Sequence, residues 1–176
     1  MSRFPEHPAW DFITSLYAMK DVAPACLALQ ERHDMDVTLM LFCLWRGAAG
    51  DSIPNARMAT LAAAARDWRA ATVLPVRAAR RWLKQRPEQE GLYRTVLAAE
   101  IDCEHGELLM LAQLTDANGG QCPPSAPQAM AENLEAVFRE RGIRQDAQDR
   151  QAVAVILAAA SALTEAGPAS PQQPVT

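Results

Sequence analysis

The chain has 176 residues, of which 49% are hydrophobic and 22% charged, and its formal net charge is −4. This composition is that of an ordinary globular protein and excludes a disordered chain. The sequence contains no run of about eighteen apolar residues, and its N-terminus lacks the apolar core and small-residue cleavage site of a signal peptide. We therefore expect a cytoplasmic protein without a membrane segment.

The length fits one domain with one sizeable core, which we expect over residues 8–166. Residues 167–176 are rich in Pro and Gln, a composition typical of a disordered tail. Helix formers dominate the sequence, and no alternating β-branched run of strand length occurs. The fold class predicted from these patterns is all-α.

The N-terminal third predicts three helices. Pro8 suits the first turn of a helix that runs to about residue 19, and Asp21 is expected to cap a second helix that ends near residue 33. Asp36 is expected to cap a third helix, which reaches Gly47. This third helix is apolar on nearly every side, which predicts a central element surrounded by the others.

Further helices are predicted along the rest of the chain. One starts at Asn55, and Pro75 is expected to interrupt it and to open a basic helix that ends before Pro87. The remaining helices are expected over residues 88–114, 127–141 and 146–165. Together these elements predict a single orthogonal or irregular bundle of seven or eight helices built around the third.

The charge of the chain is unevenly distributed. Residues 57–86 hold eight bases and one acid, a local charge of +7 that leaves −11 on the remainder. Arg77, Arg81 and Lys84 follow helical spacing beside Trp82, and we expect them to form an exposed cationic ridge. Such a ridge suits nucleic acid or an acidic partner. The six acids in residues 87–107 would partly cancel its field, which argues against nucleic acid and favours a protein partner.

Residues 100–107 gather four carboxylates, a thiol and an imidazole. On a helix, Glu100, Glu104 and Glu107 share one face, whereas Asp102 and His105 point away from it. Three interpretations stay open for this carboxylate stripe. Arg80 pairs with Glu100 or Glu104 and fixes how two helices dock, or the stripe is a solvated face, especially at Glu107, or it is a metal or acid/base site.

Signatures of catalysis are otherwise weak. The sequence has no phosphate-binding or dinucleotide-binding glycine motif, no nucleophile elbow and no zinc signature. A di-metal helical bundle needs Glu-x-x-His pairs on two helices, and only Asp102-x-x-His105 resembles one. We expect no cofactor and favour a non-enzymatic role. The four cysteines (Cys26, Cys43, Cys103, Cys122) are expected to be reduced packing thiols.

Several segments carry a family resemblance. They are Trp10-Asp11-Phe12, Ala25-Cys26-Leu27-Ala28-Leu29-Gln30, Asp36-Val37, Leu41-Phe42-Cys43-Leu44-Trp45 and Pro75-Val76-Arg77-Ala78-Ala79-Arg80-Arg81-Trp82-Leu83-Lys84. Over about residues 9–115 the chain resembles a bacterial family of small helical proteins of unknown function. The resemblance implies a compact helical fold and no known activity.

The function expected from the sequence is that of a small interaction or adaptor protein. Its predicted binding residues for an acidic or protein partner are Arg77, Arg81, Trp82 and Lys84. The alternative is a carboxylate-rich metal-binding protein or enzyme that uses Glu100, Glu104 and Glu107.

Overall fold

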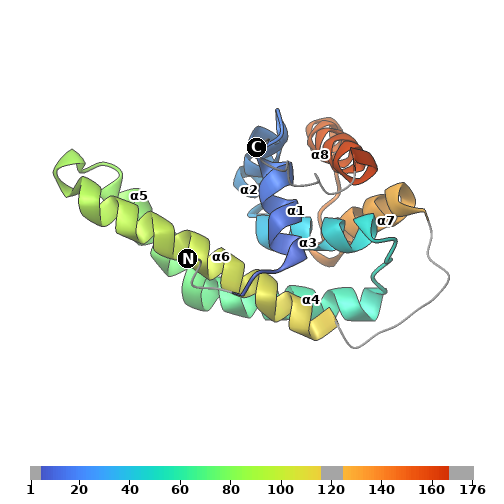
Figure 1. The fold of residues 1–176 in the computed structure, drawn as a ribbon, viewed down its shortest axis with the longest axis horizontal. Helices are drawn as coiled ribbons and strands as arrows, with labels where there is room; N and C mark the ends of the chain where they lie inside the picture. Colours follow the sequence, from blue (N-terminus) through green and yellow to red (C-terminus); the bar gives the residue numbers. More distant parts are fainter. Residues whose placement is uncertain (1–4, 116–124, 167–176) are drawn as a thin grey trace, which may run out of the picture.

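The computed structural model describes residues 5–115 and 125–166, and within these ranges the chain is helical and contains no strand (Figure 1). The helices are α1 (Pro8–Tyr17), α2 (Val22–His33), α3 (Val37–Ala48), α4 (Asn55–Trp68), α5 (Leu74–Leu83), α6 (Glu90–Thr115), α7 (Ala126–Glu140) and α8 (Ala147–Ala166). The all-α prediction is confirmed. The expected tail and Cys122 lie outside the described residues.

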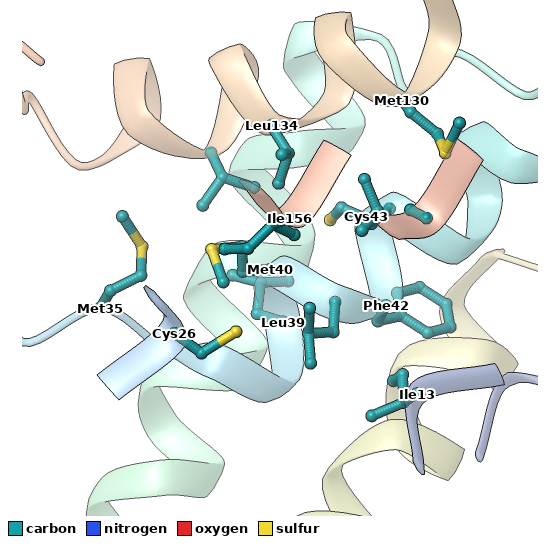
Figure 2. Close-up of a cluster of buried hydrophobic side chains, with 14 of the residues drawn as sticks. Ile13, Cys26, Met35, Leu39, Met40, Phe42, Cys43, Met130, Leu134 and Ile156 are labelled. Carbon is teal, nitrogen blue, oxygen red and sulfur yellow. The ribbon is translucent and has the colours of Figure 1, made fainter. Parts of the chain in front are cut away.

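Helix α3 lies at the centre of the helical body. The Asp36 carboxylate accepts a hydrogen bond from the Leu39 amide at 3.1 Å and so caps the helix, as predicted. All residues from 39 to 44 are buried, and α3 contacts α1, α2, α4, α6, α7 and α8. Figure 2 shows Leu39, Met40 and Phe42 among buried side chains from the surrounding helices. The third helix is therefore the axis of the core, as its sequence predicts.

The start of α2 differs from expectation. Asp21 adopts a left-handed backbone conformation, with φ of 65°, and its side chain makes no capping hydrogen bond. The prediction that the Asp21 carboxylate caps α2 is therefore wrong. The residue instead supplies the sharp turn between α1 and α2.

Helices α3 and α7 approach each other closely, and theirs is the most extensive contact between two helices of the described chain. The approach occurs at Gly47, where a Cβ atom would lie 2.5 Å from the backbone N and Cα of Met130. Such distances are below any normal carbon contact, so only glycine fits at this position.

Pro75 lies in the first turn of the basic helix α5, as predicted, but contrary to prediction it does not interrupt the helical chain. Residues 55–83 form one continuous helical segment, in which the π-helix Arg69–Val73 joins α4 to α5. Pro75 lacks the N–H of an ordinary helical hydrogen bond, and its ring crowds the carbonyl one turn earlier. A wider π turn just before the proline accommodates both defects.

The continuous segment α4–α5 runs antiparallel to α6. Helix α4 packs beside the second half of α6, whereas α5 and the first half of α6 project from the body as an arm (Figure 1). No single described helix is long and apolar enough to cross a membrane. Helices α1 and α2 together meet the length and composition criteria, but they bend by 96° at their junction.

Helix α8 is attached to α2 by a cluster of polar contacts. Asp149 is 1% exposed and accepts hydrogen bonds from Arg32 Nε at 3.0 Å and from the Asp146 amide at 3.0 Å. The Nε2 atom of His33 also lies 2.8 Å from the Asp149 carboxylate. Asp146 in turn accepts from the Asp149 amide, which is a reciprocal cap at the start of α8. These contacts position the last helix over the body.

Candidate functional site

The interface between α5 and α6 holds a buried ion-pair cluster. Arg77 Nε donates to Glu100 at 2.7 Å, and a terminal nitrogen of Arg77 donates to Glu104, also at 2.7 Å. Arg80 Nε donates to the other oxygen of Glu100. Glu100 therefore binds two guanidinium groups, and its side chain is only 6% exposed. This cluster fixes the base of the arm.

The electrostatics of the two glutamates differ. Burial by itself raises the pKa of Glu100, but hydrogen bonds from Arg80 and Arg77 outweigh burial and hold the pKa below its usual range. Burial is the largest influence on Glu104 and raises its pKa, against the opposing charge of Arg77. Glu100 is therefore a firmly ionised carboxylate between two cations.

The structure shows which arginines of α5 pair with the glutamates of α6. The predicted contact between Arg80 and Glu100 is present, whereas the partner of Glu104 is Arg77. The expectation that Arg77 lies on an exposed ridge is wrong, because its side chain is 12% exposed and engaged by two carboxylates. The acids of α6 thus neutralise the base of the basic helix.

The interpretation of Glu107 as part of a solvated face is also wrong. It is 1% exposed and not solvated, and it lies within hydrogen-bonding reach of Asp36. Each of these carboxyl groups has one buried oxygen that receives no hydrogen bond. Burial, followed by the negative charge of Asp36, raises the pKa of Glu107 to about 10. A proton held on Glu107 and donated to Asp36 satisfies both carboxyl groups.

We expect this proton to make stability depend on pH. Unfolded Glu107 loses its proton above about pH 4.3, whereas the folded protein keeps it to much higher pH. The folded state therefore binds the extra proton, and the free energy of unfolding falls as pH rises, by up to about 1.4 kcal/mol per pH unit. The Glu107→Gln substitution, which retains a donor toward Asp36, should flatten this slope.

Urea denaturation at pH 7 and pH 8 checks this prediction. Below this window, burial lowers the pKa of His105, which contributes a slope of opposite sign. Above it, the buried thiols of Cys26 and Cys43 add a slope of the same sign. Glu135→Gln, at an exposed position, is the matched control and should keep the wild-type slope. A wild-type slope in Glu107→Gln would show that the extra proton resides elsewhere.

Two further contacts near this stripe were missed by sequence reasoning. Arg69, in the π-helix, is 7% exposed and binds the Asp34 carboxylate through two hydrogen bonds of 2.9 and 2.6 Å. The indole of Trp68 donates to the Cys103 carbonyl at 3.0 Å and lies over Gly106, where a Cβ would meet the ring at 2.8 Å. Both contacts join residues that are 35 positions apart, so residue spacing within one helix does not predict them.

The catalytic and metal alternatives gain no support from this arrangement. The imidazole of His105 stacks on Trp10 with a centroid distance of 4.2 Å, and burial raises the pKa of the Cys103 thiol. Glu100 is engaged by two arginines, and Glu107 faces another carboxyl group. Within residues 5–115 and 125–166, no group of three His, Cys, Asp or Glu side chains is placed to hold a metal ion.

A cleft of about 470 Å³ lies between the body and the base of the arm. Helices α1, α2 and α3, together with Ile101 of α6, supply an apolar lining, and α5 and α6 supply charged residues. The main apolar residues are Ile13, Tyr17, Leu27, Val37, Leu41 and Ile101, and the charged residues are Arg77, Arg80, Arg81, Glu100 and Glu104. The ion-pair cluster is therefore one wall of the cleft.

The far end of α5 is exposed and cationic. Trp82 is 57% exposed, and the Arg86 guanidinium lies over its ring, 3.3 Å from the centroid. Arg81 and Lys84 are exposed beside it. In the part of the chain that the structure describes, no carboxylate lies within ion-pair distance of Arg81, Lys84 or Arg86. These three bases and Trp82 form the surface called the arm-end patch below.

Comparison with protein families shows which family the chain belongs to. The model of a family described as "Protein of unknown function (DUF2390)" matches residues 8–114, which is more than half of the chain. The chain belongs to the DUF2390 family. Searches of curated proteins and of solved structures found no match.

The DUF2390 segment coincides with a structural boundary. It begins at the first residue of α1 and ends one residue before the end of α6. The ion-pair cluster, the cleft and the arm-end patch all lie inside it, whereas α7 and α8 lie outside. Any function that the DUF2390 segment encodes can therefore be sought in these three features.

Proposed function

We propose that this protein is a cytoplasmic interaction protein that binds an acidic segment of a partner protein through the arm-end patch. The proposal rests on a difference between the two ends of the basic segment, of which only one is paired with acids. Arg77 and Arg80 are neutralised by α6, whereas Arg81, Lys84 and Arg86 have no acidic partner in the described chain. The patch therefore keeps a positive field at a projecting position.

An exposed tryptophan among uncompensated bases is typical of protein interfaces, where Trp and Arg are enriched. Arg86 covers one face of the Trp82 ring, so that face is not available for stacking with a nucleic-acid base. A protein surface rich in Asp and Glu fits the patch better. The cytoplasmic setting is part of the proposal and is supported by the free thiols of Cys26, Cys43 and Cys103.

Site-specific photocrosslinking tests this proposal. A photoreactive benzoylphenylalanine in place of Gln85, which is exposed between Lys84 and Arg86, should give a discrete adduct in the cells that make the protein. The crosslinked partner segment, sequenced by mass spectrometry, should be rich in Asp and Glu. The Lys84→Glu and Arg86→Glu double variant should reduce the adduct about tenfold, because complementary charge speeds encounter.

The matched control is the double variant Arg144→Glu and Arg150→Glu, which carries the same change in charge at the α7–α8 end of the molecule. It should leave the adduct unchanged. An adduct that ignores charge reversal at the patch, or one with nucleic acid, would contradict the proposal.

A further inference from the structure

We propose that the cleft between α1, α2, α3 and the base of the arm is a binding site for a small amphipathic carboxylate, with an apolar body and one anionic group. This site shares Arg81 with the arm-end patch, but its other lining residues lie outside that patch, and the inference does not depend on the proposed function. Its volume of about 470 Å³ lies within the range of pockets that bury small ligands, which is about 300–1,000 Å³.

The apolar part of the cleft is incompletely covered. Tyr17, Leu27 and Ile101 are 37%, 45% and 46% exposed, although large apolar side chains are usually buried. They come from three different helices and line this one cleft. An apolar ligand body placed between them removes that surface from water, which is favourable.

The charge of the cleft favours a single negative group. Three guanidinium groups face two carboxylates, so the lining carries one positive charge in excess. Arg77 and Arg80 are already engaged by Glu100 and Glu104, whereas Arg81 has no ion-pair partner in the described residues. The planar guanidinium of Arg81 is thus available for a bidentate contact with a ligand carboxylate.

Two features make the site ordered. Val37, Thr38 and Leu41 line it from the central helix α3, and its charged wall is held by the ion-pair cluster. The Tyr17 hydroxyl adds a hydrogen-bond donor to the lining, and burial raises the pKa of this group, so it stays protonated. An ordered lining reduces the entropy lost on binding.

Calorimetric titration of the full chain with decanoate, decanol and decylammonium tests the proposal, because these probes share an apolar body and differ in charge. Decanoate should bind with one site per chain and about tenfold more tightly than decylammonium. Arg81→Gln should lower the decanoate affinity about tenfold and leave decanol unchanged. Ile101→Glu should weaken all three probes.

Lys84→Gln is the matched control, since it removes one positive charge from α5 outside the cleft lining and should change no affinity. Leu27→Asp replaces Ile101→Glu if circular dichroism shows the latter unfolded. Equal binding of decanoate and decylammonium, more than one decanoate per chain, or an unchanged affinity in Arg81→Gln would overturn the assignment. Because the crosslinking test alters Lys84 and Arg86 only, the two proposals fail independently.

Discussion

Replacing Glu100 with glutamine is expected to lower the free energy of unfolding by about 3 kcal/mol. The carboxylate accepts hydrogen bonds from Arg77 and Arg80, whose side chains are only 12% and 19% exposed. Its neutralisation leaves Arg80 with no carboxylate partner and Arg77 with Glu104 alone. The expected loss lies at the lower end of the range for broken buried pairs because this second carboxylate remains.

Chemical denaturation of Glu100→Gln beside Glu90→Gln measures the effect. Glu90 pairs with Arg94 on the same helix, but both side chains are more than half exposed. A solvent-exposed pair of this kind contributes about 0.5 kcal/mol or less. If the two variants lost equal stability, the buried cluster would contribute no more than an exposed ion pair.

The substitution Gly47→Ala is also expected to destabilise the fold by about 3 kcal/mol. The added methyl group would overlap the backbone of α7 at Met130, and a backbone cannot move aside as a flexible side chain can. Alanine has the better helix propensity, by about 1 kcal/mol, and this gain reduces the loss only in part.

Thermal or urea denaturation of Gly47→Ala and Gly91→Ala separates these two contributions. A Cβ atom at Gly91 meets nothing within 4 Å, so that variant reports helix propensity alone and should be neutral or slightly more stable. Equal stabilities of the two variants would mean that α3 and α7 separate without cost.

Local patterns predicted much of the fold because they act over one or two helical turns. The apolar run of α3 and its Asp36 cap are complete within residues 36–47, and both appear as expected. At Pro75, the local sequence pattern does not predict the observed structure. The sequence marks a break there, but the preceding π-helix absorbs the missing hydrogen bond within a continuous segment. Tertiary packing along α6 decides between these outcomes.

The charged site was predicted only in part, for a related reason. Helix spacing allows Arg77 to share a face with Arg81 and Lys84 or to lie beside Arg80. The choice depends on where α6 lies against α5, and the structure places Arg77 inward. The pKa of Glu107 depends on Asp36, which is distant in sequence and caps another helix. No periodicity within one helix reports such a partner.

The contact between α3 and α7 shows that the segment matched by the family and the segment that forms the core are different. The stretch shared with the DUF2390 family ends at residue 114, yet the central helix meets its most extensive neighbour beyond that point. A chain cut at residue 114, where the family match ends, would leave the α3 surface around Gly47 facing water. The part of this protein that the family model matches is therefore smaller than the part needed to close its core.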